Sequence, residues 1–252
     1  MDASRRGGRK ILNMQTTIAQ LSDLHLDDRM SEEFGVNSRN NIITVLNDIV
    51  NNGIEYIIIT GDIGLQKSFD WLNKEIANRK LIVHYALGNH DQISTFYEID
   101  DYKNRLIENK LIYKIVINEI PILIIDSSNE VFEDDQKNII GKYIQENTIG
   151  YIFAHHPILD CGNTFMDIKF PLKKRNDLQK YIQSKENKII WFCGHYHNVY
   201  ENNYNNIDQY VTIAVSMQIK NYSESIQIAS KSFGYRKINI HENIFNTEII
   251  VC

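Results

Sequence analysis

Residues 56–62 read YIIITGD, and this short stretch predicts the class of the fold. Its first five residues are β-branched or aromatic, and they end directly in a Gly-Asp pair. A short apolar run with a polar end is typical of a buried strand in an α/β protein. We therefore expect a strand at Tyr56–Thr60 whose carboxyl end presents Gly61 and Asp62.

The segments on either side extend this strand to a β-α-β unit. Residues 17–21 (TIAQL) are a second β-rich run. Between the two runs, apolar side chains recur at helical spacing over residues 38–51, and Asn52-Gly53 ends the predicted helix. The alternation continues with a helix through Phe69, Leu72 and Ile76, a strand at residues 81–87 and a mixed helical stretch at residues 94–109.

The second half of the chain adds antiparallel strands. Residues 111–117 and 121–125 predict a hairpin around Asn118-Glu119. Helices are expected near residues 136–146 and 176–184, and strands at residues 149–154, 188–193, 211–215, 225–229, 235–240 and 245–251. The polar, Asn-rich residues 198–208 predict an exposed loop. This inventory predicts an α/β fold of two stacked mixed β-sheets flanked by helices, a four-layer α-β-β-α sandwich.

Composition limits the classes of function. A chain of 252 residues that is 43% hydrophobic can bury one substantial core, so we expect one domain over residues 14–252. Residues 1–13 are basic and are expected to be a disordered leader or an expression remnant. The net charge of -5 provides no positive field for polymeric nucleic acid. No apolar run of about 18 residues predicts a membrane-spanning helix.

The three cysteines, Cys161, Cys193 and Cys252, are odd in number and widely spaced. They predict neither a disulfide framework nor a zinc ribbon, which favours a reducing cytoplasm. Cys161 lacks an arginine at the spacing of a cysteine phosphatase loop, and Cys193 follows an apolar run. A cysteine nucleophile is therefore not expected.

Five polar clusters fall at the ends of predicted strands, where an open α/β sheet gathers its ligand-binding groups. Any one of them has an ordinary structural explanation as a turn. Together they supply carboxylate, amide and imidazole groups, which suit Mn, Fe, Zn, Co or Ni. The clusters are Asp23-Leu24-His25, Gly61-Asp62, Gly88-Asn89-His90-Asp91, His155-His156-Pro157 and Gly194-His195-Tyr196-His197.

The spacing within two of the clusters has a geometric reading. In an extended segment, side chains two residues apart lie on one side. Asp23 and His25 would then bind one ion while Leu24 points into the core. His195 and His197 repeat the spacing.

The ordered set of clusters resembles the signature of the calcineurin-like metallophosphoesterase superfamily, D-x-H, G-D, G-N-H-D/E, H and G-H-x-H. All of these blocks are intact between Asp23 and His197. The resemblance implies two divalent or trivalent metal ions bridged by Asp62. It implies one ion held by Asp23, His25, Asp62 and His197, and a second held by Asp62, Asn89, His155 and His195.

The resemblance also implies roles for three residues that are not ligands. His90 would approach the phosphoryl group or the leaving oxygen as a catalytic residue. Asp91 would support the site by orienting a neighbouring ligand or His90. His156 would contact the substrate or serve in packing. The implied reaction is phosphate ester hydrolysis by a hydroxide that bridges the two ions, without a covalent phosphoenzyme.

Finer likeness points to the bacterial class III cyclic-nucleotide phosphodiesterase and glycerophosphodiesterase branch. The segment at residues 157–178, AVSMQ at residues 214–218 and Gly234-Tyr235-Arg236 carry this likeness. Ile158 departs from it, because a second proline often stands there. A small phosphodiester is the substrate that the likeness implies.

Other functions stay open at this point. A phosphomonoesterase, a nuclease, a lipid-pathway nucleotide pyrophosphatase and a catalytically silent scaffold are the alternatives. The basic run Lys169, Lys173, Lys174 and Arg175 is either a specificity patch or a solvated face. The oligomeric state is also open, a homodimer included.

Overall fold

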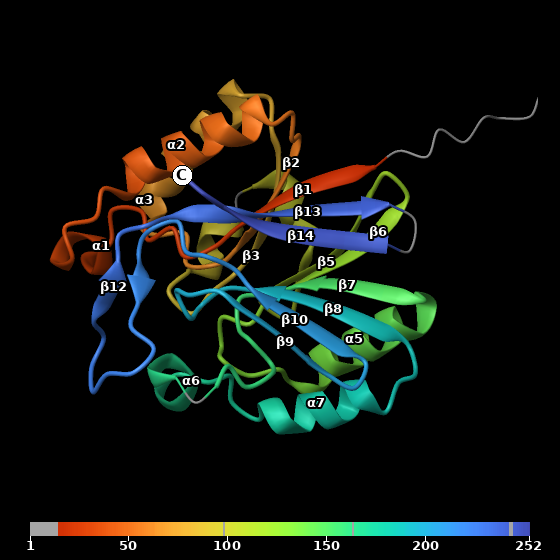
Figure 1. Cartoon of the computed structure of the whole chain (residues 1–252). Coiled ribbons are helices and arrows are strands. Elements are labelled where there is room, and N and C mark those ends of the chain that lie inside the picture. The colour runs from red at the N-terminus through yellow and green to blue at the C-terminus, as the bar shows by residue number, and fades with distance from the viewer. Residues whose placement is uncertain (1–14, 98, 163, 242–243) are drawn as a thin grey trace, which may run out of the picture.

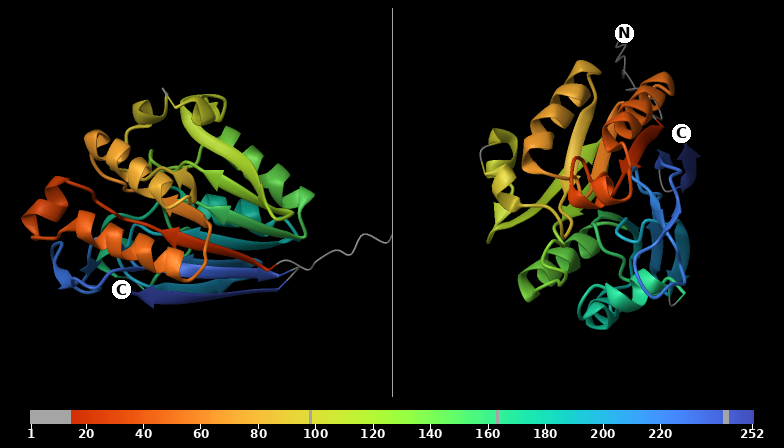
Figure 2. Two further views of the ribbon diagram at one scale, coloured as in Figure 1. Left: turned by 90° about the horizontal axis from the view of Figure 1, so that it is seen from above. Right: turned by 90° about the vertical axis from the view of Figure 1, so that its left-hand side faces the viewer.

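The computed structural model describes residues 15–97, 99–162, 164–241 and 244–252. Two large β-sheets face each other, and helices cover their outer faces (Figures 1 and 2). This arrangement confirms the predicted α/β fold of two mixed sheets flanked by helices. The leader expected at residues 1–13 lies outside the described residues.

The first sheet has five strands in the order β14-β13-β1-β2-β3. Its strands are β1 (Thr16–Leu21), β2 (Tyr56–Thr60), β3 (Ile82–Ala86), β13 (Gly234–His241) and β14 (Ile244–Val251). β1, β2 and β3 are parallel, and β13 is antiparallel to both β1 and β14. The connecting helices α2 (Ser38–Asn51) and α3 (Gln66–Asn78) bury one apolar stripe each on this sheet.

The second sheet has seven strands in the order β4-β5-β6-β7-β8-β10-β9. Its strands are β4 (Leu106–Ile107), β5 (Lys110–Ile117), β6 (Ile120–Ile125), β7 (Ile149–Phe153), β8 (Lys188–Cys193), β9 (Tyr200–Tyr204) and β10 (Ile207–Val211). β5 and β6 form the predicted hairpin. β6, β7, β8 and β10 are parallel neighbours. Helices α5 (Asp134–Glu146) and α7 (Arg175–Gln183) cover the outer face (Figure 1).

The remaining elements are short. They are α1 (Arg29–Glu33), η1 (Ile93–Phe96), α4 (Asp100–Lys103), α6 (Phe165–Lys169), β11 (Gln218–Ile219) and β12 (Ile228–Ser230). η1, α4 and β4 make up the mixed stretch predicted at residues 94–109. α1 and α6 were not predicted, because a helix of five residues is too short to show a helical period.

Three predictions in the C-terminal half are wrong. Residues 198–208 are not a loop, because β9 and β10 pair there as an edge hairpin that turns at Asn205 with a φ of 55°. The strand predicted at residues 211–215 ends at Val211. Beyond it the chain leaves the sheet to bond residues near the end of β1, with the Val215 N–H donating to Ser22 O at 3.0 Å. The strand predicted at residues 225–229 is instead Ile228–Ser230.

The core between the sheets is rich in aromatic rings. Phe153 stacks on Phe192 at 4.7 Å between ring centroids, and Phe192 stacks on Tyr210 at 5.5 Å. Phe245 of β14 lies 5.6 Å from Tyr210, which joins the two sheets. This packing fixes the sheets relative to each other, so the loops at their strand ends can build one site. Among the described residues, no helix has the length and apolarity needed to span a bilayer.

Candidate metal centre

The loops that follow β1, β2, β3, β7 and β8 meet at one end of the two sheets. Ligand atoms of Asp23, His25 and His197 all lie within 4.8 Å of one another, and those of Asp23, Asp62 and His155 do the same. All five side chains are buried. Segments that are far apart in sequence therefore converge as the five sequence clusters predict.

The first histidine pair faces nitrogen to nitrogen. His25 Nε2 lies 3.1 Å from His197 Nε2. The other nitrogens are engaged, His25 Nδ1 with Asp28 at 2.5 Å and His197 Nδ1 with the Met217 carbonyl at 2.9 Å. Because these partners only accept, both Nδ1 atoms carry the proton and both Nε2 atoms present a lone pair when neutral. Two facing lone pairs need a cation or a proton between them.

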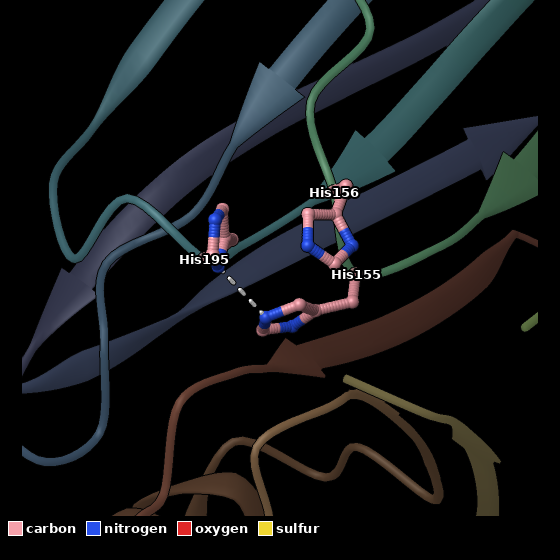
Figure 3. A group of neighbouring side chains, drawn as sticks. All are labelled: His155, His156 and His195. Carbon is pink, nitrogen blue, oxygen red and sulfur yellow. Dashed lines mark hydrogen bonds between the residues drawn. The ribbon is translucent and has the colours of Figure 1, made fainter. Parts of the chain in front are cut away.

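The second pair repeats this arrangement with a different ring nitrogen. His155 Nε2 lies 3.1 Å from His195 Nδ1 (Figure 3). His155 Nδ1 donates to the Thr60 carbonyl at 2.7 Å, and His195 Nε2 donates to the Phe170 carbonyl at 2.9 Å. The carbonyl acceptors again direct both lone pairs inward when the rings are neutral.

Asp62 lies between the two histidine pairs. Its Oδ2 atom is 3.7 Å from His25 Nε2 and 3.3 Å from His155 Nε2. Although burial opposes its charge, His155 holds the pKa of Asp62 well below its ordinary value. Asp62 thus brings an ionised carboxylate to both pairs.

Asn89 supplies the clearest sign that the site takes a cation. Its Oδ1 atom is buried and has no hydrogen-bond partner. An unpartnered buried amide oxygen is costly, about 1–3 kcal/mol, and a metal ion would satisfy it. Carboxylate, amide and inward-facing imidazole groups together fit the divalent metals expected from the sequence.

Asp91 supports the backbone of the centre. Its carboxylate accepts from the N–H groups of Gly88, Asp62 and Ile63, each at 2.8 Å. Burial and the charge of Asp62 raise the pKa of Asp91 to about 7. Asp91 therefore lies beside Asp62 and holds the backbone of Asp62 in place.

His90 and His156 differ in exposure. The exposed His90 borders the cavity, and its ring centroid lies 5.4 Å from that of His25. His156 is 1% exposed, its Nδ1 lies 2.9 Å from Ser127 Oγ, and it does not border the cavity. Its ring centroid lies 4.3 Å from that of His195 (Figure 3). The structure therefore places His156 beside His195 and away from the cavity.

The prediction of an extended backbone at Asp23-Leu24-His25 and at His195-Tyr196-His197 is wrong. Asp23 and His25 have φ values of 54° and 47°, and His195 and His197 have 70° and 48°. Both segments turn sharply where their strands end. Placing a non-glycine residue in this left-handed region of backbone conformation costs about 1–3 kcal/mol. Such strain is typical of functional sites. Leu24 still points into the core, fully buried.

Glycines in the clusters permit the loops to approach each other. A Cβ on Gly88 would lie 2.2 Å from Asp62 Oδ1, and a Cβ on Gly194 would lie 1.8 Å from Ser22 Oγ. Neither position has room for a side chain. The glycines are therefore required by close packing around the ligands.

Two orienting groups were not expected from the sequence. Asp28 holds His25 and also caps α1, where it accepts from the Ser31 N–H at 2.9 Å. The Phe170 carbonyl, which orients His195, follows α6. An Asp three residues after His25 is a recognisable helix cap, whereas a backbone carbonyl leaves no sequence signal.

A cavity of about 790 Å³ opens over the centre. Its lining includes His25, Asp62, Asn89, His90, His195 and His197. Cys161 is not part of that lining, and burial raises the pKa of its thiol to about 12. That value argues against a cysteine nucleophile.

Residues 16–205 match the model of the family described as calcineurin-like phosphoesterase. The chain belongs to this family. It is therefore a hydrolase of phosphate esters, which confirms the resemblance drawn from the five clusters. The matched region contains every predicted ligand.

Individual proteins that are similar to this chain have names consistent with the family. A probable cyclic nucleotide phosphodiesterase of Fibrobacter succinogenes is 26% identical over 242 residues and covers 92% of each chain. The 3',5'-cyclic adenosine monophosphate phosphodiesterase CpdA of Haemophilus influenzae is 23% identical, over 90% of this chain and 86% of its own. A dimetal phosphatase from Danio rerio has the same fold, with a TM-score of 0.71, 10% identity and coverage of 93% of this chain and 95% of its own.

Proposed function

We propose that the chain hydrolyses small phosphodiesters, cyclic nucleotides among them, at a centre of two metal ions. The observation that carries the proposal is the position of Asp62 Oδ2, 3.7 Å from one histidine pair and 3.3 Å from the other. Two donor sets that share one carboxylate support two bridged ions. The names of the two bacterial relatives support the substrate class.

The ligand sets follow from the two histidine pairs. Asp23, His25 and His197 would hold the first ion with Asp62, and Asn89, His155 and His195 would hold the second with Asp62. When bound, ions such as Mn, Fe, Zn, Co or Ni supply Lewis acidity, which activates water and neutralises charge on phosphoryl oxygens.

The chain's own groups position and protonate the substrate. Asp62 Oδ1 accepts from the His90 N–H at 3.0 Å, which fixes the His90 backbone beside the centre. The exposed imidazole of His90 would bond a phosphoryl oxygen or give a proton to the leaving oxygen. Asp91 would keep Asp62 in place through the backbone.

The cellular setting that we propose is the cytoplasm. Cys161, Cys193 and Cys252 are all free thiols. Free thiols are typical of a reducing compartment, where small phosphate esters are available as substrates.

The proposal is tested on the full chain, stripped of metal and reloaded separately with Mn, Co, Ni, Zn and Fe. The substrates are bis-p-nitrophenyl phosphate, p-nitrophenyl phosphate, 2',3'-cyclic AMP and 3',5'-cyclic AMP. We expect two ions per chain and faster hydrolysis of diesters than of the monoester. Asp62→Ala should abolish turnover and lower the metal content, and His90→Ala should keep the metal but lower kcat by about 10²- to 10⁴-fold. Asp70→Asn, on the exposed face of α3, is the matched control.

Each contrary result has a distinct meaning. Preference for p-nitrophenyl phosphate would make the chain a phosphomonoesterase, and cleavage of DNA in place of small diesters would make it a nuclease. Binding of a single ion would overturn the bridged centre. Two bound ions without turnover of any substrate would remove the phosphodiesterase assignment.

A further inference from the structure

The cavity over the metal centre has an apolar wall. We propose that this wall selects phosphodiesters whose second ester group carries an uncharged flat ring, such as the aryl ring of an aryl ester or the nucleobase of a nucleoside. The inference rests on the proposed function. It adds a preference for the ester group that remains bound to phosphorus after the leaving group departs. The wall consists of Met30, Phe34, Leu65, Met166, Phe170 and Ile226.

Four separate segments build the wall. Met30 and Phe34 come from α1 and its end, Leu65 from the loop between β2 and α3, Met166 and Phe170 from α6 and its end, and Ile226 from the connection between β11 and β12. Figure 1 shows β12 between α1 and α6. All four segments lie outside the strands of the two large sheets, in loops and short elements whose side chains can vary while the sheets stay the same.

Hydrogen bonds join α1, α6 and the β11–β12 segment into one surface. Lys231 Nζ, just after β12, donates to the Gly35 carbonyl at 2.9 Å, just after α1. The Phe165 N–H, at the start of α6, donates to the Asn221 carbonyl at 2.6 Å. The β11–β12 segment is thus tied to both short helices. These bonds hold the segments that carry the apolar side chains next to one another beside the cavity.

The charged groups beside the wall are already paired within the chain. Among the described residues that line the cavity, Arg29 is the only lysine or arginine, and its Nε donates to Glu33 at 2.7 Å. Glu130 pairs with Lys173 at 2.7 Å, and Asp28 pairs with His25. The Arg29 side chain is 88% exposed in this pair, so a second anion on the substrate would have to compete with Glu33 for this cation.

Half-buried and exposed apolar side chains gain by covering a flat apolar group. Phe170 is 44% exposed and Leu65 is 42% exposed, so both have surface to lose to a ligand. The cavity volume of about 790 Å³ is within the range of small-molecule sites. The wall therefore favours an aryl or nucleobase group and disfavours a charged one.

The test compares three diesters that share p-nitrophenolate as the leaving group. They are phenyl, methyl and 4-carboxyphenyl p-nitrophenyl phosphate, assayed on the Mn-loaded full chain. Because the bond that breaks is the same, differences in kcat/KM report the remaining group. We expect phenyl to exceed both methyl and 4-carboxyphenyl by about tenfold or more.

Variants of wall residues test whether the wall causes the preference for the phenyl diester. Phe34→Ala and Ile226→Ser should lower kcat/KM for the phenyl diester by about tenfold and leave the methyl diester within about twofold. Glu33→Lys should raise turnover of the 4-carboxyphenyl diester, because it adds a cation beside Arg29. Tyr222→Ala is the control, since Tyr222 lies in the same connection, is 76% exposed and does not line the cavity.

A binding measurement without catalysis completes the test. Saturation-transfer NMR on the metal-free chain should detect the rings of diphenyl phosphate, and the signal should fall in the Phe34→Ala Ile226→Ser double variant. Equal turnover of the phenyl and methyl diesters by the wild type would overturn the inference and leave the proposed function standing. No turnover of any of the diesters would remove the proposed function, while ring contacts in the NMR experiment would still support the wall.

Discussion

Each of the four histidines that we propose as ligands has one ring nitrogen that is held by the protein and one that faces the centre. The holding partner is a carboxylate for His25 and a backbone carbonyl for the other three. The identity of the free nitrogen therefore depends on where a carbonyl lies in space. His195 presents Nδ1, whereas His25, His155 and His197 present Nε2. Residue types predicted the ligands, but not these tautomers.

Asp91→Asn tests the support of the ligand loops. The amide has one accepting oxygen for three N–H groups, and its own NH₂ would face an N–H. We expect metal affinity to fall by about 10- to 100-fold and the free energy of unfolding by about 1–3 kcal/mol. Titration calorimetry with Mn and urea unfolding measure the two effects. Asp70→Asn should change neither, and an unchanged affinity in Asp91→Asn would exclude the supporting role.

At the scale of elements, β3 carries a half-buried titratable side chain, His84. Burial, with a further contribution from Arg105, lowers the pKa of His84 to about 4. Its ring centroid lies 6.2 Å from that of Tyr113, over which Arg105 also packs. The unfolded chain, with an ordinary histidine pKa of about 6.5, binds more protons between these two pKa values. Stability should therefore fall as the pH drops from 6.5 toward 4.

His84→Gln is expected to weaken this pH dependence. Melting temperatures of the wild type and the variant are measured between pH 7 and pH 4, and their difference cancels the other titrating groups. The variant should lose less stability than the wild type across this range. Parallel curves would show that His84 takes up its proton equally in the folded and unfolded chains.

The short elements show where sequence patterns stop being informative. α2 and α3 have 14 and 13 residues, enough for an apolar stripe to repeat, and their helical periodicity was correctly interpreted. α1 and α6 have caps, Asp28 and Thr164, but no repeat. The edge hairpin β9–β10 is polar on its outer side, so its asparagines suggested a loop.

At the scale of the whole molecule, Arg236 joins the two sheets. It lies in β13 of the first sheet and is fully buried. It donates to the Val211 carbonyl at 3.1 Å and to Glu201 at 2.7 Å, both in the second sheet, and lies 5.2 Å from the Tyr210 ring centroid. A buried cation in this position helps to set the distance between the sheets.

Arg236→Met should lower the free energy of unfolding by about 1–3 kcal/mol, because the Val211 carbonyl loses its side-chain partner in a buried site. Urea unfolding measures the change. Lys237→Met is the control from the next position, where the half-exposed Glu248 is the partner at 3.2 Å, and its loss should be at most about 1 kcal/mol. Equal losses would mean that Arg236 contributes no more than a surface pair.

The sequence by itself determined the family and the order of strands and helices around the candidate centre, and it predicted the side chains that meet there. These properties depend on residue type and local spacing, which a chain carries without its fold. The tertiary structure decided the left-handed backbone at Asp23 and His195, the free nitrogen of each histidine and the place of His156 beside His195 and away from the cavity. It also decided the apolar wall, which α1, the loop before α3, α6 and the β11–β12 segment form. Each of these depends on backbone atoms from distant segments that meet only when the two sheets pack.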